Sequence, residues 1–311
     1  MLHISVIIPV YNAAAFLEKA VESALQFEEV KEILLIEDCS TDNSLKVCQE
    51  LTLEHSRVQL FQHPDKGNHG AGASRNLGLE KVSQEFTAFL DADDYYLPTR
   101  FDEEKELFKD LKIEGIFGAV GTEFLSEKGK VEFEKKFKNI ELTTVKHHAE
   151  GKDVFHGLLG LNQDFGTFFS LIALTIRTES VRKNNLKFNE NLRIHQDSDF
   201  IIKLSYHCHL KSGSIEKPVS IRGVHDDNRI TKIEIYSEKY NERQFLLKES
   251  IFNWALDKEI SKEYFQHIVL SKKAFELSLN KGFRKYVNFL GAIFSDPKIL
   301  KTRYRFTYLK K

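Results

Sequence analysis

Three carboxylates stand within four residues, at Asp91, Asp93 and Asp94 of the 311-residue chain. Carboxylates this close repel one another, and the repulsion destabilises the fold unless a cation offsets it. A small set of hard oxygen ligands is typical of sites where Mg²⁺ or Mn²⁺ also binds phosphate oxygens. The cluster therefore indicates either a divalent-metal site for a phosphate-bearing ligand or a solvated acidic turn in which Asp94 caps a helix.

Short apolar runs alternate with helical patterns through the first 90 residues. We expect four strands there, over residues 4–9, 33–36, 58–61 and 86–90. We also expect three helices. The first spans 13–26, the second runs from the capping residues 40–43 to about 53, and the third runs from the glycine loop 67–72 to about 82. This alternation predicts a parallel sheet covered on both faces. Ligands of such sheets bind at the carboxyl ends of the strands, so the polar clusters Tyr11-Asn12, Glu37-Asp38 and Asp91–Asp94 should meet in one crevice.

The rest of the chain is less regular. We expect an exposed hairpin or flexible loop over 126–150, strands over 168–176 and 214–221, a short helix near 179–184, a helix opened by 195–199, and helices from about 233 onward. This pattern predicts a catalytic domain over residues 1–232 and a helical, basic extension over residues 233–311.

The composition excludes several classes of protein. A net charge of −1 gives the molecule no overall attraction for nucleic acid. No uncharged apolar run reaches the ~18 residues of a membrane span, and residues 1–9 lack the basic region and cleavage site of a signal peptide. Three cysteines without metal-binding spacing are typical of reduced thiols in the cytoplasm. We therefore expect a cytoplasmic globular protein.

Four motifs together resemble the family 2 glycosyltransferases, in the order and spacing of that family: Val6–Asn12, Ile36–Ser44, Gly72–Leu79 and Phe89–Asp94. The resemblance covers roughly the first 100 residues and is absent after residue 235. It implies the A-type glycosyltransferase fold, an α/β fold whose mostly parallel mixed sheet is flanked by helices. It also implies inverting transfer of a sugar from a nucleoside-diphosphate sugar, with a UDP-sugar as the leading donor, to a saccharide or lipid-linked acceptor in polysaccharide biosynthesis.

The first two motifs imply a pocket for the nucleotide base. By resemblance, Pro9 and Tyr11 line it, with the tyrosine ring against the pyrimidine, and Asn12 follows them. Asp38 accepts a hydrogen bond from the base N–H, with Glu37 beside it. The family usually has two aspartates followed by glycine, and this chain departs from that pattern with Glu37 and Cys39.

The other two motifs imply the contacts of the ribose and the diphosphate. By resemblance, Arg75 lies on the nucleotide side of the crevice, where a structural ion pair is the alternative role. Asp91 reaches the ribose, with Ala92 beside it, and Asp93 holds the Mn²⁺ or Mg²⁺ that bridges the diphosphate. Related enzymes place a late histidine on the metal or the diphosphate. His225 is the candidate here, and a lone surface histidine is the other interpretation.

The resemblance also implies the catalytic base, Asp197, which stands in the segment His195–Phe200. Gln196 replaces the glutamate that is common there. A role of Asp197 in capping the following helix stays open, and Asp199 is the next candidate for the base. A single base on the acceptor side implies direct displacement, hence inversion.

Two other functions remain as alternatives. A nucleotidyltransferase that makes activated sugars would need a glycine-rich phosphate loop after the first strand, and this chain lacks one. A non-catalytic sugar-nucleotide binder would have little use for Asp93 and Asp197.

The C-terminal residues 271–311 hold eleven Lys and Arg against Glu276 and Asp296, a local balance of +9. They also include aromatic residues such as Phe283 and Tyr304. Two interpretations stay open: a tail packed on its own acidic catalytic domain, or a peripheral contact with anionic lipid at the inner face of the membrane, near a lipid-linked acceptor.

Overall fold

The computed structural model describes residues 2–136, 142–162, 164–166, 168–226, 234–235 and 237–302. The chain divides into two compact units, Met1–Asp227 and Asn228–Lys311, and each is described by itself. The predicted domain boundary at residue 232 lies outside the described residues.

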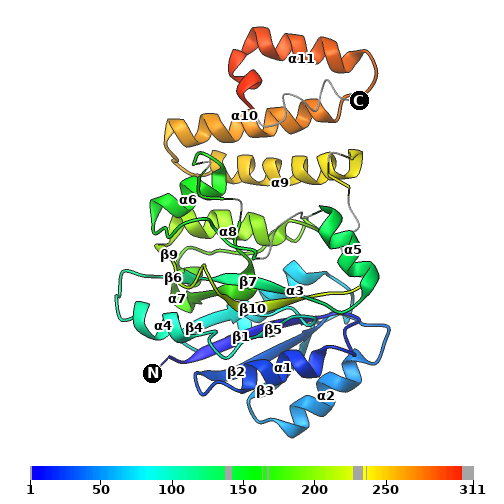
Figure 1. Ribbon diagram of the computed structural model, residues 1–311, viewed down its shortest axis with the longest axis vertical. Coiled ribbons are helices and arrows are strands. Elements are labelled where there is room, and N and C mark those ends of the chain that lie inside the picture. The colour runs from blue at the N-terminus through cyan, green and yellow to red at the C-terminus, as the bar shows by residue number, and fades with distance from the viewer. Residues whose placement is uncertain are drawn as a thin grey trace. The chain divides into compact units, whose positions relative to one another are not determined.

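The main sheet of the first unit has seven strands in the order β3-β2-β1-β4-β8-β6-β9 (Figure 1). Their bounds are β1 Ile4–Val10, β2 Val30–Glu37, β3 Val58–Gln62, β4 Phe86–Phe89, β6 Gly115–Phe117, β8 Leu174–Arg177 and β9 Leu210–Ser212. Strand β8 is antiparallel to both of its neighbours, whereas the other pairs of this sheet are parallel. The predicted fold class, a mostly parallel mixed sheet flanked by helices, is confirmed.

Helices cover both faces of this sheet because successive side chains of a strand point to opposite faces. On one face, Val6 and Ile8 of β1 share a core with Leu17 and Val21 of α1 and with α2 and α4. On the other face, Ile7 lies against α3, and Phe89 of β4 makes an edge contact with Phe200 of α8. The bounds of these helices are α1 Leu17–Leu25, α2 Ser44–Glu54, α3 Ala71–Lys81, α4 Asp102–Leu107 and α8 Gln196–His207.

A second, three-stranded sheet has the order β5-β10-β7. Its strands are β5 Tyr95–Tyr96, β7 Ala119–Phe124 and β10 Pro218–Val224. Tyr95 of β5 pairs antiparallel with Ile221 of β10. Because β5 begins directly after Asp94 and β10 ends directly before His225, this small sheet brings two distant parts of the sequence to the same place.

Two expectations for the middle of the chain were wrong. Residues 127–136 form helix α5 (Glu127–Lys136) and not a hairpin or loop. Glu and Lys are good helix formers, and Phe133, which is buried, anchors the helix against Phe124 of β7. The apolar run 168–176 is a strand only in β8, since the 3₁₀ turn η1 (Leu171–Ala173) precedes it. An apolar run alone does not separate a strand from buried irregular structure.

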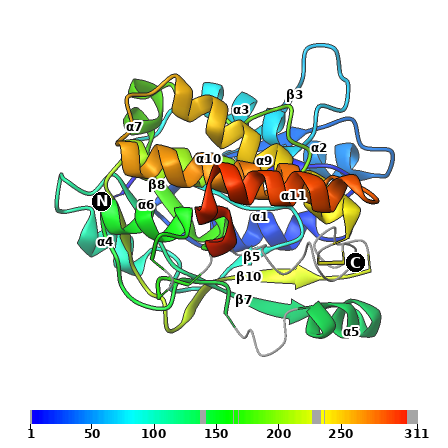
Figure 2. The same ribbon diagram turned by 90° about the horizontal axis from the view of Figure 1, so that it is seen from above.

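Two more helices complete the first unit, α6 (Lys152–Leu159) and α7 (Thr178–Lys183). The second unit consists, over its described residues, of α9 (Glu238–Leu256), α10 (Lys262–Ser278), α11 (Arg284–Ser295) and the 3₁₀ helix η2 (Pro297–Lys301). Ser237 and Ser261 cap α9 and α10 with their hydroxyl groups. Helix α10 packs between α9 and α11 (Figure 2). Tyr304, at the end of the basic tail, lies outside the described residues. Within the described part of the chain, every helix is too short or too polar to cross a bilayer.

A buried ion pair holds α4 to the sheet. Arg100 is fully buried and its guanidinium contacts the carboxylate of Glu104 and, at 3.2 Å, the hydroxyl of Thr175. Burial raises the pKa of Glu104, and the charge of Arg100 opposes that rise. Breaking such a pair from one side leaves the other charge unsatisfied in the core.

We expect Glu104→Ala to lower the free energy of unfolding by about 3–5 kcal/mol, because Arg100 would stay buried without its partner. The matched control is Glu106→Ala in the same helix, where Glu106 pairs with Lys109 at the surface. That change should cost less than about 1 kcal/mol. Urea unfolding followed by circular dichroism measures both, and equal effects would contradict the assignment.

Candidate active site

The ends of three neighbouring strands lie at the same edge of the main sheet. Val10 of β1 is in register with Glu37 of β2, and Ile7 of β1 with Phe89 of β4. The residues that follow these strands are therefore neighbours in space, as the parallel pattern predicts. They include most of the candidate site residues.

Asp38 is almost completely buried and holds the loop that precedes α3. Its carboxylate accepts hydrogen bonds from the backbone N–H groups of His69 and Gly70, both at 2.7 Å, and the side chain of Asn68 donates to its backbone carbonyl at 2.9 Å. This carboxylate therefore already accepts two hydrogen bonds from within the fold. Its hydrogen bond with a base N–H stays a prediction.

Glu37 and Asn12 hold the turn after β2 in place, Glu37 from β2 with a link to β3 and Asn12 from the end of β1. Glu37 is buried and accepts from the N–H of Ser40 and from Gln62, both at 2.6 Å. The side-chain oxygen of Asn12 accepts from the N–H of Thr41 at 2.8 Å. Both residues therefore shape the crevice whether or not they also contact a ligand.

The residues expected at the base pocket differ in how far a ligand can reach them. The ring of Tyr11 is exposed (43%), Pro9 is half-buried, and Ala92 is buried in the core. Tyr11 therefore offers a free aromatic face, whereas Ala92 can offer a ligand only its backbone. Cys39 has a φ of 60°, which explains why a glycine suits this position of the motif.

Arg75 of α3 forms an ion pair with Asp91, with 2.5 Å between Nη2 and Oδ1. The arginine is 7% exposed and lies over the ring of Phe188, and its Nε has no hydrogen-bond partner among the described residues. The side chain of Asp91 is 41% exposed. The structural ion pair foreseen for Arg75 is present, and Asp91 is still open to a ligand.

Asp93 and His225 meet although 132 residues separate them in the sequence. His225 Nε2 lies 3.1 Å from the carboxylate of Asp93, and the imidazole stacks on the ring of Phe16 with 4.8 Å between centroids. Gly223 allows this approach, because a Cβ there would lie 2.4 Å from the backbone oxygen of Asp93. The interpretation of His225 as a lone surface histidine is therefore wrong.

This pair fits a divalent cation. The imidazole nitrogen of His225 and a carboxylate oxygen of Asp93 are both metal-ligating atoms, and at 3.1 Å apart they would be close enough to hold the same ion. The described residues contain no group of three or more His, Cys, Asp or Glu side chains that could hold a metal. Mg²⁺ is commonly bound by one or two carboxylates together with phosphate oxygens of a substrate and water, so Asp93 and His225 would hold such an ion together with a phosphate-bearing ligand.

Asp94, the third carboxylate of the cluster, is buried and accepts a hydrogen bond from the N–H of Gly223 at 2.9 Å. Burial raises its pKa well above the usual range, and the nearby carboxylates of Asp93 and Asp91 add to the rise. Asp94 therefore joins β10 to the end of β4 and does not cap a helix.

Asp197 lies in the first turn of α8 and is half-buried. Its carboxylate accepts from the N–H of Ser198 at 2.8 Å, while His195 occupies the N-cap position. Asp199 is fully buried and forms an ion pair with Lys203 at 2.6 Å. The structure thus favours Asp197 over Asp199 as the carboxylate that an acceptor could reach.

Helix α3 links Asp197 to the nucleotide side. Gly72 lies against the side chain of Gln196, so that a Cβ on Gly72 would be 2.8 Å from its amide carbon. Asn76 donates to the backbone oxygen of Phe188 at 2.9 Å and accepts from its N–H at 2.8 Å. Asn76 lies in the motif Gly72–Leu79, which by itself indicated no role for this side chain.

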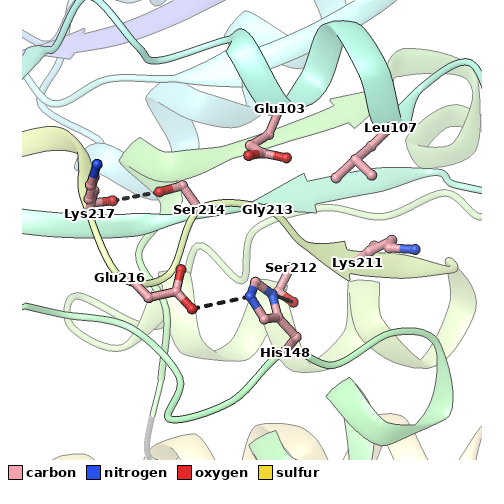
Figure 3. A pocket seen from close by; sticks show the side chains of 9 residues that line it. All are labelled: Glu103, Leu107, His148, Lys211, Ser212, Gly213, Ser214, Glu216 and Lys217. Atoms are coloured by element: carbon pink, nitrogen blue, oxygen red, sulfur yellow. Dashed lines mark hydrogen bonds and ion pairs between the residues drawn. The ribbon is translucent and has the colours of Figure 1, made fainter.

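A cavity of 450 Å³ opens elsewhere, beside β9 at the other end of the main sheet from β3 (Figure 3). Its lining residues are Glu103, Leu107, His148, Lys211, Ser212, Gly213, Ser214, Glu216 and Lys217. The two lysines are balanced by the two glutamates, and no predicted site residue lines it. We therefore place the candidate active site at the strand ends and not in this cavity.

The comparisons with known proteins concern the family and the fold of the chain. The profile described as Glycosyl transferase family 2 matches residues 5–160. An uncharacterized glycosyltransferase of Haemophilus influenzae is 38% identical over 102 residues, which are 32% of this chain and 40% of that protein. The matched region thus covers less than half the length of the first curated relatives.

Two solved structures resemble the chain over nearly its whole length. TarS 1–349 of S. aureus, in complex with UDP-GlcNAc, has a TM-score of 0.64 at 16% identity and covers 99% of this chain and 88% of that one. The mannosyltransferase PcManGT from Pyrobaculum calidifontis, in complex with GDP-Man and Mn²⁺, has a TM-score of 0.53 at 14% identity, with 99% and 85% covered. At these identities the likeness shows the fold alone.

The three cysteines offer a direct test of the crevice. Cys39 is exposed, whereas burial raises the pKa of Cys48 and of Cys208 to about 12. Because thiolates are the reactive form, we expect iodoacetamide to modify Cys39 alone in the folded chain. UDP with Mn²⁺ should slow this reaction, since Cys39 directly follows Asp38.

Mass spectrometry of the intact protein counts the modified thiols. Cys39→Ser should remain unmodified when folded, and unfolding in urea should expose three thiols in the native sequence and two in this variant. Equal labelling rates with and without UDP would contradict a nucleotide site at this turn.

Proposed function

This chain belongs to glycosyl transferase family 2, and on that premise we propose that it transfers a sugar from a UDP-sugar to a hydroxyl group of a saccharide or lipid-linked acceptor, with inversion at the anomeric carbon. The observation that carries the proposal is the meeting of Asp93 and His225 at 3.1 Å, at the strand edge that also bears Asp91. The side chains at these strand ends include the aromatic, carboxylate and imidazole groups that could bind a nucleoside diphosphate and its cation.

On the donor side, the exposed ring of Tyr11 is available to stack on the base. Asp91, held at one oxygen by Arg75, can accept a hydrogen bond from a ribose hydroxyl through the other. Asp93 and His225 would hold the divalent cation, which supplies electrostatic stabilisation of the charge on the departing diphosphate. The complexes of TarS with UDP-GlcNAc and of PcManGT with GDP-Man and Mn²⁺ support a donor of this class.

On the acceptor side, Asp197 takes the proton of the attacking hydroxyl group. The new bond forms between the acceptor oxygen and the anomeric carbon as the bond from that carbon to the diphosphate oxygen breaks. The electron pair of the broken bond leaves with the diphosphate. One displacement without a covalent enzyme intermediate inverts the configuration.

The metal assignment predicts how UDP binding depends on Mn²⁺. We expect the wild-type chain to bind UDP more tightly with Mn²⁺ than with EDTA, and Asp93→Ala to abolish that difference, because a cation needs this carboxylate beside the diphosphate. Isothermal titration calorimetry measures both affinities. Asp102→Ala, which removes an exposed carboxylate of α4, should retain the difference. Equal UDP affinity of the wild type with Mn²⁺ and with EDTA would refute the assignment.

The base assignment predicts a loss of turnover without a loss of binding. Asp197→Asn keeps the shape of the side chain but cannot accept a proton, so we expect turnover to fall roughly 10²–10⁴-fold with UDP affinity little changed. Release of UDP from a panel of UDP-sugars, with water or added saccharides as acceptor, provides the assay. Near-normal turnover in Asp197→Asn would move the role to another residue.

This assay, together with one that supplies UTP and sugar phosphates, separates the alternatives. A nucleotidyltransferase would form UDP-sugar and pyrophosphate from UTP and a sugar phosphate. A non-catalytic binder would bind UDP-sugars and release no UDP with any acceptor. Either result would replace the proposed transferase.

A further inference from the structure

Helix α11 of the second unit exposes an apolar face. Five large side chains on it are 44–86% exposed: Phe283, Tyr286, Val287, Leu290 and Phe294. They follow one another at spacings of three, one, three and four residues, which places them on one side of the helix. Most soluble surfaces show such residues singly, and a continuous row of them marks an interaction site.

The core of the second unit does not need this row. The opposite side of α11 buries Phe289 in a cluster with Ala274 and Leu277 of α10 and Ile299 of η2. Helix α11 is thus held by one apolar side while it presents another to the surroundings. We call the exposed row, from Phe283 to Phe294, the docking face.

Basic residues accompany the docking face. Over residues 282–302 the chain carries Arg284, Lys285, Lys298 and Lys301, and the acidic residue there is Asp296. The carboxylate of Asp296 accepts from the N–H of Lys298 at 3.0 Å and so begins η2. Residues 282–302, which include the docking face, therefore carry four basic residues against one acidic residue, a net charge of +3.

We propose that the docking face binds the surface of an anionic lipid bilayer, with α11 lying in the plane of the interface. An apolar row rich in aromatic residues beside Lys and Arg is the pattern of helices that bind in this way. Charge favours an anionic bilayer over a second copy of the chain as the partner of this face. A second copy of the chain would bring two positive surfaces together, whereas anionic headgroups attract them. This inference goes beyond the proposed function and does not depend on it.

Co-sedimentation of the full chain with vesicles tests the proposal. We expect binding to vesicles of phosphatidylcholine with about a third phosphatidylglycerol, and much weaker binding to phosphatidylcholine alone. Each Lys or Arg near such a surface strengthens binding about fivefold. Raising the salt concentration should weaken the binding because it screens these charges.

Two sets of variants test the face itself. Phe283→Ser and Phe294→Ser should each lower the partition onto anionic vesicles about tenfold or more, because each removes an aromatic side chain from the interface. Their matched controls are Leu53→Ser and Leu111→Ser, which change equally exposed apolar residues of the first unit (88% and 83%). Arg284→Glu with Lys285→Glu should lower binding to anionic vesicles and leave UDP affinity unchanged.

Three results would overturn the proposal. Equal binding to anionic and neutral vesicles would contradict the role of the basic residues. Phe283→Ser and Phe294→Ser variants that bind as well as Leu53→Ser would contradict the role of the apolar row. A dimer in analytical ultracentrifugation that these phenylalanine variants dissociate, without vesicle binding, would show that a second copy occupies the face. Circular dichroism and UDP binding confirm that each variant is folded.

Discussion

The ion pair between Arg75 and Asp91 ties helix α3 to the end of β4 at the candidate site. Arg75 is buried, so its charge depends on this carboxylate in place of water. The helix that carries Arg75 also holds the segment that leads to Asp197, because Asn76 binds the backbone of Phe188 and Gly72 lies against Gln196. The position of Asp197 relative to Asp91 is therefore set through α3. A shift of α3 would move Asp91 and Asp197 together.

The three carboxylates that first indicated a metal site are separated by their partners. Asp91 pairs with Arg75, Asp93 lies beside His225, and Asp94 accepts from the N–H of Gly223. From the sequence alone, a cation was expected to offset their repulsion. In the structure these partners also offset it. What favours a cation is that Asp93, unlike buried Asp94, faces a second metal-binding side chain and remains partly open.

The sequence predicted those parts of the fold that depend on local pattern. Strands β1, β2 and β4 contain short apolar runs that alternate with helical patterns, so this alternation alone located the carboxyl ends of the strands. The meeting of Asp93 with His225 depends instead on β5, two residues long, pairing with Ile221 far along the chain. So short a strand has no periodicity to detect. Helix α5 was missed for another reason, since its charged residues suit a solvated loop and a surface helix equally.

The proposed active site and the proposed docking face lie in different units of the chain. The family match ends at residue 160, within the first unit, whereas the docking face lies in the second. Binding energy at a bilayer leaves the donor site unchanged, but it raises the effective concentration of any acceptor held in the same bilayer. Such attachment would therefore favour a lipid-linked acceptor over a free saccharide, while a soluble nucleotide-sugar would gain nothing from it. A modest, salt-sensitive affinity would suffice for this, because an enzyme acting on a lipid-linked acceptor would also have to leave a product that stays in the membrane.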